Sequence, residues 1–417
     1  MRLTLHRALC ISNSNEADAL IDFDRIVKGI RQAPASAALL SFALFIVMDF
    51  AIRVGSSWHK EPDMLTFDTP YRSRAYWAIK DFLQQKSPPD ILLIGPSDVA
   101  AALTRSEATY LNRRVEEMTT HRSQYLEKKL RDLDSPYKST SSLAIPGEMP
   151  SDTYFLFNTL VKNKKPQVIF LSFTPRNLCD ATFGAPANTD IFKVLSKLGG
   201  LKDYQLSCRS SFWERVDYMF SQACSVYDHK WELTTWQHHL AHAMLGQSFD
   251  FSRFIGPDSI RKMSLLELPE DFGLGESITH PYDPKNAEYL SNINEYRQRY
   301  KRFNRKLFDQ QLAFFKQFCR SCQSEGVQLV VGNSPITQEN KQLLPKPIYN
   351  LCISEASKAV RESGGTWVDL DRPDVFQHDD FYDSVHLNGK GGLKYFDLIS
   401  SIVGNRSFLA TKKSQGL

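Results

Sequence analysis

Ile91-Leu92-Leu93-Ile94-Gly95-Pro96-Ser97-Asp98 is the stretch of sequence that decides the fold. Four apolar residues are followed by a glycine, a proline and a serine. A short, continuous apolar run bounded by turn residues is typical of a strand that is buried on both faces of a parallel sheet. The pattern predicts a strand over residues 91–95 that ends in a tight turn, with Ser97 at its carboxyl end.

Apolar runs of the same kind recur along the chain and alternate with helical patterns, which is typical of an α/β fold. We expect further strands at 142–145, 168–173, 328–332 and 366–370. Helices are expected at 71–86, about 110–133, 152–163, 298–325, 350–363 and after Gly392. Crossovers of this length hold helices and are nearly always right-handed. We therefore expect a flavodoxin-like, three-layer fold around a parallel five-stranded sheet, with ligands at the carboxyl ends of the strands, where Ser97 falls.

Residues 178–297 interrupt this alternation, because the fold needs only one helix between the third and fourth strands. A structureless loop of this length is improbable in a compact domain. The segment also contains aromatic-rich helical patterns at 212–220 and 230–245. We interpret it as a helical cap inserted over the edge of the sheet that carries Ser97.

A second motif, Asp383-Ser384-Val385-His386-Leu387-Asn388, lies almost three hundred residues after the first. A serine hydroxyl is a weak nucleophile until an imidazole takes its proton, and a carboxylate holds that imidazole in the required tautomer. The two motifs together indicate acyl-transfer chemistry with Ser97, His386 and Asp383. Alternatively, Ser97 caps the following helix and His386 is an ordinary histidine on a surface loop.

One segment near the N-terminus is long and apolar enough for a membrane. Residues 35–48 carry no charge, and the apolar run continues past Asp49 to about 18 residues, near the lower limit for a spanning helix. More basic residues precede the segment than follow it, which predicts a cytoplasmic N-terminus and an external C-terminal part. A buried core helix is the alternative, and Asp49 favours it.

The composition excludes some classes of protein and leaves others open. Of the 417 residues 42% are hydrophobic, and 51 basic against 47 acidic residues give a net charge of +4. No basic stripe interleaved with aromatic residues is present, so we expect no nucleic-acid partner. Seven cysteines allow disulfides, but Cys319 and Cys322 fall within an expected helix, which favours two core thiols or one local bridge.

The motifs resemble the SGNH (GDSL-like) hydrolase superfamily, named for blocks that contribute Ser, Gly, Asn and His. More narrowly, the chain resembles the membrane-anchored bacterial branch that includes the D-alanyl-lipoteichoic acid D protein and the alginate O-acetylation proteins. The resemblance covers roughly residues 90–400 apart from the insertion, and only its first and last blocks are close to specific. Pro96 departs from the usual first block.

By resemblance, the second block is Ala144-Ile145-Pro146-Gly147 and the third ends in Asn177. The resemblance implies an oxyanion site formed by Ser97, Gly147 and Asn177. The third block lacks the usual glycine and aspartate, and Asn333 is a second candidate for its asparagine. Arg176 and Asn388 are candidates for substrate binding. The alternative is that Gly147 is an ordinary glycine in a turn and does not contribute to an oxyanion site.

The resemblance also implies an organisation and a function. We expect a cytoplasmic tail (1–32), a transmembrane anchor (33–53), a membrane-proximal helix and linker (54–89) and an SGNH-like domain (90–405) that holds the cap. The protein would be a single-pass protein of the bacterial cytoplasmic membrane with its domain on the periplasmic side. It would act as a serine O-acyltransferase or carboxylic-ester hydrolase on a cell-envelope glycan or acyl ester, beside a membrane-bound O-acyltransferase partner. An inactive SGNH-fold glycan-binding or scaffold protein of a polysaccharide-modifying complex is the alternative.

We expect no cofactor and no metal. His238 and His242 share one face of an expected helix at a spacing that zinc ligands also use. No glutamate lies between them as a His-Glu-x-x-His motif requires. An aromatic packing face with Trp231 and Trp236 is the preferred interpretation of this segment.

Overall fold

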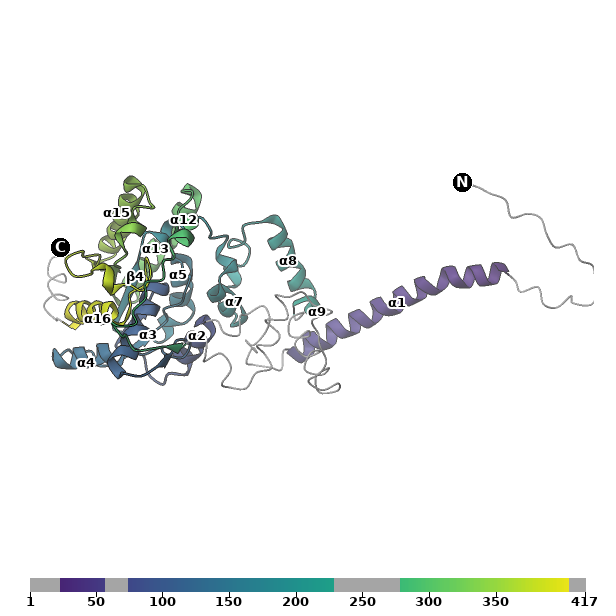
Figure 1. Ribbon diagram of the computed structural model, residues 1–417. Helices are drawn as coiled ribbons and strands as arrows, with labels where there is room; N and C mark the ends of the chain where they lie inside the picture. Colours follow the sequence, from purple (N-terminus) through teal and green to yellow (C-terminus); the bar gives the residue numbers. More distant parts are fainter. Residues whose placement is uncertain (1–22, 57–73, 229–277, 405–417) are drawn as a thin grey trace, which may run out of the picture. The chain divides into compact units, whose positions relative to one another are not determined.

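The computed structural model describes residues 23–56, 74–228 and 278–404 (Figure 1). Contacts divide the chain into two compact units. One comprises Met1–Lys60 with Ser221–His229, and the other comprises Glu61–Phe220 with Lys230–Leu417. The second unit carries the sheet and both sequence motifs.

A five-stranded parallel sheet forms the centre of the second unit, with the order β3-β1-β4-β6-β7. The chain is thus an α/β protein, as the alternation of strands and helices predicted. The strands are β1 (Ile91–Ile94), β3 (Thr140–Ser142), β4 (Val168–Phe173), β6 (Gln328–Asn333) and β7 (Thr366–Asp369). The expected strand at 142–145 begins two residues earlier, and backbone hydrogen bonds from Leu143 to Leu93 and from Ile145 to Gly95 extend its pairing.

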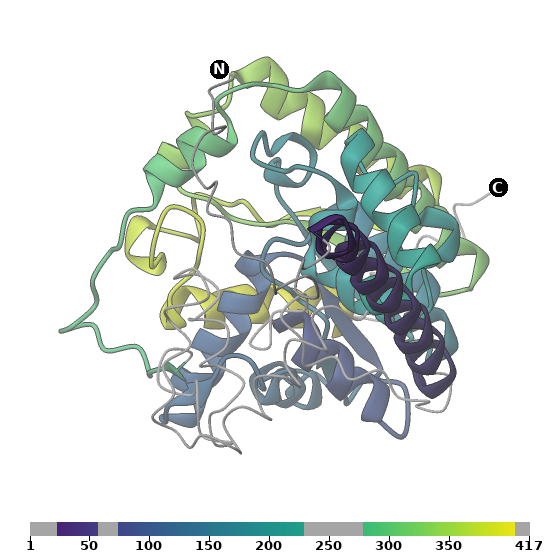
Figure 2. The ribbon, with the colours of Figure 1, turned by 90° about the vertical axis from the view of Figure 1, so that its right-hand side faces the viewer.

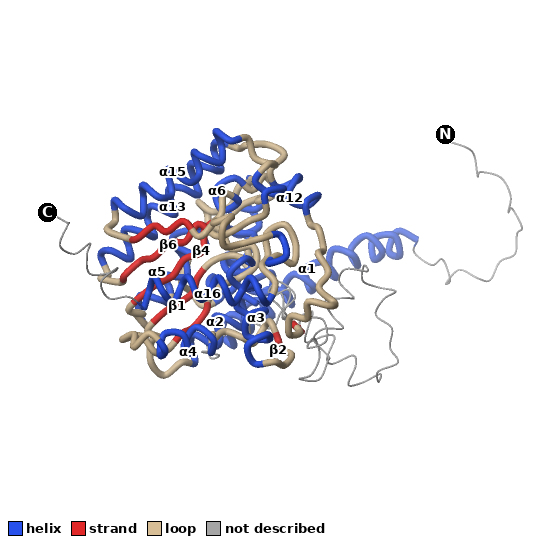
Figure 3. The backbone as a smooth tube through the Cα atoms, turned by 60° about the vertical axis from the view of Figure 1, so that its left-hand side comes forward, coloured by secondary structure: helices blue, strands red, loops and turns tan. Residues whose placement is uncertain are grey.

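Helices cover both faces of the sheet (Figure 3). One face packs against α2 (Arg74–Gln84), α5 (Pro150–Thr159), α7 (Asp190–Lys197), α13 (Arg305–Ser324) and α15 (Lys346–Glu362). The other packs against α3 (Ser97–Leu111), α4 (Gln124–Asp132) and α16 (Gly389–Gly404). Figure 2 shows α16 (yellow) beside α3 (blue), two helices that the sequence separates by almost the whole domain.

Alternate residues of each central strand enter different cores, as expected for a strand buried on both faces. In β1, Leu92 and Ile94 face the α5 side, whereas Ile91 and Leu93 face the α3 side. The sheet therefore lies between two separate hydrophobic cores, and its carboxyl edge is held rigidly from both sides.

The expected helix at about 110–133 is confirmed only in its second part, as α4 (Gln124–Asp132), and its expected start is wrong. α3 begins at Ser97, directly after the first strand, and ends at Leu111, where Asn112 adopts the left-handed conformation with φ of 47°. A short antiparallel pair formed by β2 (Val115–Glu116) and β5 (Ile278–Thr279) follows. α4 then starts after Ser123, whose hydroxyl accepts a hydrogen bond from the Leu126 N–H.

The expected helix at 298–325 is two helices, α12 (Ile293–Arg299) and α13, because Asn304 caps the second one. Short elements complete the second unit. They are α6 (Arg176–Cys179), α14 (Gln338–Lys341) and the 3-10 turns Val161–Asn163, Pro186–Asn188, Lys202–Tyr204 and His378–Asp380.

The first unit contains α1 (Phe23–Ser56) and α9 (Ser225–Asp228). Within α1, Ala37–Gly55 forms a stretch long and apolar enough to cross a membrane, with a mean hydropathy of 2.1 and none of its residues buried. α8 (Phe212–Ala223) links the two units covalently. It contains the segment 212–220 that was expected to be helical, whereas 230–245 lies outside the described residues.

Gly95 makes the turn after β1 possible. Its φ is +142°, and a Cβ at this position would lie 2.9 Å from the Ser172 Cβ and 3.1 Å from the Val99 Cγ1. Only a residue without a side chain therefore fits between β1, β4 and the start of α3.

Gly95→Ala should lower the free energy of unfolding by about 2–6 kcal/mol, since backbone strain and overpacking each cost about 1–3 kcal/mol. Urea unfolding in detergent solution measures the loss. Gly326→Ala is the matched control, because Gly326 also has a positive φ of +72° but has open space where the Cβ would be. Equal losses in the two variants would contradict the steric role of Gly95.

Candidate active site

Ser97 is the first residue of α3 and lies at the carboxyl end of β1. Pro96 occupies the N-cap position in an extended conformation, and no side chain caps the helix there. The Ser97 Oγ lies 2.8 Å from the His386 Nε2. The hydroxyl is therefore engaged with the distant histidine and does not act as a helix cap.

His386 and Asp383 form the second half of the site. The His386 Nδ1 lies 2.6 Å from the Asp383 Oδ2. The other carboxylate oxygen accepts hydrogen bonds from the backbone N–H groups of Val385 and His386, at 2.9 and 2.8 Å. The histidine side chain is 20% exposed and that of the aspartate 8%. An incoming molecule can thus reach the imidazole, while the carboxylate behind it is largely shielded from water.

The surroundings of Asp383 keep it ionised. Burial alone would raise the pKa of its carboxyl, but the imidazole and the two backbone N–H groups act in the opposite direction. The net effect holds the pKa of Asp383 below its usual range. At neutral pH the residue is therefore a carboxylate, which can orient the imidazole and stabilise its protonated form.

The three residues form a continuous hydrogen-bonded chain from hydroxyl to carboxylate. The Nδ1–H group donates to the carboxylate, so Nε2 is left with the lone pair that can accept the hydroxyl proton. Such a chain is the arrangement required for nucleophilic attack by a serine. The sequence-based prediction named these three residues, and the structure brings them together.

The loop that carries the histidine is fixed through Ser384. The carbonyl oxygen of Ser384 accepts hydrogen bonds from the N–H and the hydroxyl of Thr337, at 3.1 and 3.0 Å. Its hydroxyl contacts Asn292 and accepts from the Asn340 Nδ2 at 3.0 Å. The sequence analysis missed these three residues. Each is an ordinary polar residue, and only the fold makes it adjacent to the loop.

Asn388 closes the other end of this loop. Its side-chain amide donates to the Asp379 carbonyl at 2.7 Å, and its Oδ1 accepts from the Gly391 N–H at 3.0 Å. Both polar ends of the side chain are thus occupied at the start of α16. The geometry supports a structural role in the turn, and its substrate-binding role stays a prediction.

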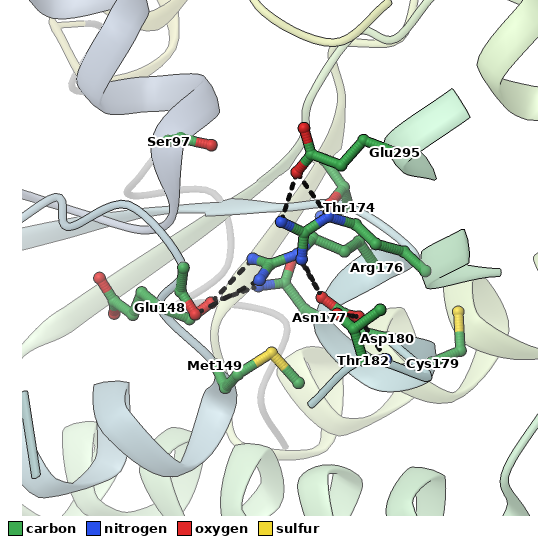
Figure 4. A network of polar contacts seen from close by, with 12 residues as sticks. Ser97, Glu148, Met149, Thr174, Arg176, Asn177, Cys179, Asp180, Thr182 and Glu295 are labelled. Carbon is green, nitrogen blue, oxygen red and sulfur yellow. Dashed lines mark hydrogen bonds and ion pairs between the residues drawn. The ribbon is translucent and has the colours of Figure 1, made fainter. Parts of the chain in front are cut away.

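The turn after β3 and the segment after β4 lie against each other (Figure 4). The Asn177 Nδ2 donates to the Glu148 carbonyl at 3.4 Å, and its Oδ1 accepts from the Thr174 N–H at 2.8 Å. The Arg176 Nη2 donates to the Gly147 carbonyl at 3.4 Å. Gly147, Arg176 and Asn177 therefore meet at one edge of the sheet, although the Asn177 amide donates to a carbonyl of the protein.

Arg176 is largely committed to an ion pair. Its Nε lies 3.0 Å from the Asp180 Oδ2, and Asp180 also contacts Arg299 at 2.5 Å. Burial would raise the pKa of Asp180, but the two guanidinium groups and Thr182 hold it below its usual range. The two terminal nitrogens of Arg176 make longer contacts, 3.4 and 3.5 Å to backbone carbonyls. They are therefore the part of the side chain that could most easily bind a ligand instead.

Backbone N–H groups are the clearest donors for a developing oxyanion. The first turn of a helix has N–H groups without intrahelical partners and a partial positive charge. Ser97 occupies this position in a helix that no side chain caps. Gly147 has a φ of +83° with open space where a Cβ would be. Both features suit an approach of substrate to the backbone.

Two buried acids at the site were missed by the sequence analysis. Asp98, next to Ser97, contacts the Ser172 hydroxyl, and the hydrogen bonds continue from Ser172 to Ser334 at 2.6 Å and from Ser334 to Tyr395 at 2.8 Å. Glu148 follows Gly147 and accepts from the Thr153 hydroxyl at 2.6 Å. Burial raises the pKa of Glu148 well above its usual range. In the sequence, Asp98 directly follows Ser97 and Glu148 directly follows Gly147, and this adjacency could have identified both acids as candidates for the site.

The remaining candidates lie elsewhere. The Asn333 Nδ2 donates to Asp369 at 2.9 Å, so this side chain is tied to the neighbouring strand. Cys319 and Cys322 are buried free thiols, one of the two expected possibilities. His238, His242, Trp231 and Trp236 lie outside the described residues.

Asp383→Asn should destabilise the protein at pH 7 by about 1.5–3 kcal/mol, the range for a hydrogen bond to a charged group. A carboxyl whose pKa is lower in the folded state contributes stability above its unfolded pKa, near 4 for Asp. That contribution is lost as the pH falls through the folded value. The difference between wild type and variant should therefore shrink below about pH 4.

Chemical unfolding in detergent solution across pH 3 to pH 8 measures this difference. Asp203→Asn, at an exposed position in the 3-10 turn Lys202–Tyr204, controls for the loss of one negative charge. A wild-type advantage over Asp383→Asn that stays constant down to pH 3 would contradict the lowered pKa of Asp383.

Comparison of the sequence with known protein families and with curated protein sequences finds no match to either. Among the described residues, the hydrogen-bonded chain from Ser97 through His386 to Asp383 is the feature that bears most directly on function.

Proposed function

We propose that this protein is a serine acyltransferase or esterase that works through an acyl-enzyme on Ser97. One observation carries the proposal, the hydrogen-bonded chain that joins the Ser97 hydroxyl to His386 at 2.8 Å and His386 to Asp383 at 2.6 Å. The N-terminus of α3 and the open Gly147 turn support it, because Ser97 begins that helix and Gly147 follows β3, the neighbour of β1 in the sheet.

The reaction begins when the Ser97 Oγ attacks the carbonyl carbon of an ester and its proton moves to the His386 Nε2. The carbonyl oxygen becomes an oxyanion, held by backbone N–H groups of Ser97 and Gly147. The ester bond then breaks, and the departing alcohol takes the proton from the imidazole. In the second half, water or a sugar hydroxyl attacks the acyl carbon and passes its proton to His386. The bond between the acyl carbon and the Ser97 Oγ then breaks, and His386 returns the proton to the Ser97 Oγ. Asn177 joins the oxyanion site if its amide turns away from Glu148.

We assign the α/β unit to the SGNH (GDSL-like) hydrolases and its sheet to the flavodoxin-like folds. The order β3-β1-β4-β6-β7 supports this assignment, because it corresponds to 2-1-3-4-5 when the strands are numbered in chain order. The Gly147 turn after β3 and the Asn177 segment after β4 support it too. The departures at Pro96 and in the third block make an inactive glycan-binding or scaffold protein the competing outcome of the test.

We further propose that the protein is anchored in a bacterial cytoplasmic membrane by α1. The apolar stretch Ala37–Gly55 has the length for one span. Arg25, Lys28 and Arg31 precede it, which favours a cytoplasmic N-terminus and a periplasmic α/β unit. A cell-envelope glycan is then the accessible acceptor, and a membrane-bound O-acyltransferase is the proposed source of acyl groups.

A fluorophosphonate probe tests the nucleophile. The probe forms a covalent bond only with an activated serine, so wild type should be labelled and Ser97→Ala should not. His386→Ala should reduce the labelling rate by about 10³-fold or more, because the base is lost.

Ser324→Ala, at an exposed position near the end of α13, is the matched control and should be labelled like wild type. Labelling that survives in Ser97→Ala would overturn the assignment of the nucleophile. Absence of labelling in folded wild type would favour the scaffold function.

Ser384→Ala tests whether the loop geometry matters for the chemistry. The variant removes the hydroxyl contacts with Asn292 and Asn340 but leaves the reacting atoms in place. We expect the rate of labelling to fall by about 10-fold to 100-fold, since a misplacement of about 1 Å has effects of this size. Ser354→Ala, an exposed serine of α15, controls for the change of residue type. An unchanged rate in Ser384→Ala would show that these contacts do not position His386.

A further inference from the structure

One face of α8 carries apolar side chains that the described structure leaves exposed. Phe212, Trp213 and Met219 are 70%, 74% and 62% exposed, and Val216 is 37% exposed. The spacing i, i+1, i+4, i+7 places all four within one stripe of the helix. No residue of α8 is buried. A contiguous exposed patch of this kind marks an interaction surface.

The opposite face of α8 makes polar contacts with the segment directly before the helix and with Asn188. Glu214 accepts hydrogen bonds from the N–H groups of Ser210 and Ser211 at 2.8 and 3.0 Å and from the Asn188 side chain at 3.3 Å. The Arg209 guanidinium lies 4.3 Å from the Tyr218 ring centroid. α8 therefore presents its polar side to the protein and its apolar side outward, the reverse of an ordinary surface helix.

The end of α8 is attached to the apolar helix α1. The Arg53 Nη2 donates to the carbonyl of Ala223, the last residue of α8, at 2.9 Å. Shortly after it, the Val226 N–H donates to the Asp49 Oδ1 at 2.9 Å. Asp49 precedes Gly55, the end of the apolar stretch, by about 9 Å of helix at 1.5 Å per residue. Interfacial helices bury their apolar face about 5–10 Å below the headgroup boundary, which matches this depth.

We propose that α8 is an interfacial helix that lies on the bilayer spanned by α1, with its apolar face toward the acyl chains. Trp213 and Phe212 suit this location, because aromatic side chains are favoured at the boundary between headgroups and hydrocarbon. The proposal rests on the membrane anchoring in the proposed function and is independent of the chemistry at Ser97. It gives the protein a second contact with lipid besides the span.

Photocrosslinking in proteoliposomes tests the occupant of this face. The full chain is reconstituted in vesicles of phosphatidylcholine and phosphatidylglycerol that carry radiolabelled phosphatidylcholine. p-Benzoylphenylalanine replaces Trp213 or Met219 on the apolar face. The matched control replaces Tyr218, an aromatic residue on the polar face of the same helix. A second control replaces Phe45 within the apolar stretch of α1.

We expect lipid adducts at positions 213 and 219 in yields about fivefold or more above that at 218, with strong labelling at 45. Lipid labelling at 45 with equal, low yields at 213, 218 and 219 would overturn the proposal while the span stands. Protein–protein adducts at 219 would assign the face to a second copy of the chain and also overturn it. Absence of lipid labelling at 45 would overturn both the proposed membrane span of α1 and the proposed interfacial location of α8. Fluorophosphonate labelling of the same vesicles reports separately on Ser97.

Discussion

The close approach of the backbone at Gly95 is the constraint on which the site depends. β1 and β4 are neighbouring strands, and the turn after β1 passes so near Ser172 that no Cβ fits between them. Because the chain turns within two residues, α3 starts at Ser97 and its uncapped N-terminus lies at the edge of the sheet. The position of the hydroxyl, the direction of the helix dipole and the free backbone N–H groups all follow from this one turn.

The other half of the site has a different origin. The imidazole is carried by a loop, and loops do not hold geometry by themselves. Here the loop is tied to three elements of the fold through the backbone and side chain of Ser384 and through Asn388. Asn292 lies at the end of the long insertion, so this insertion contributes at least one contact that supports the histidine. The positions of Asp383 and His386 thus depend on residues outside the hydrogen-bonded chain that they form with Ser97.

The strands and the candidate residues could be predicted because their signals are local. β4 begins and ends where its apolar run does, and Asp383 and His386 stand three residues apart in a turn-rich stretch. α3 was missed because its run of small residues after Val99 shows little helical period, and the stop depends on the left-handed Asn112. The β2–β5 pair and the contacts of Ser384 join residues far apart in sequence, and no local pattern encodes them.

Asp49 has a consequence for the biogenesis of the protein. A carboxylate within an apolar span is costly to insert, and its partner N–H belongs to Val226, 177 residues later in the chain. In the proposed membrane-anchored protein, α1 enters the bilayer before Val226 has been made, and the neighbouring Arg53 is a partner that is already present. The contact between Asp49 and the Val226 N–H therefore forms only after the chain has been made as far as α9.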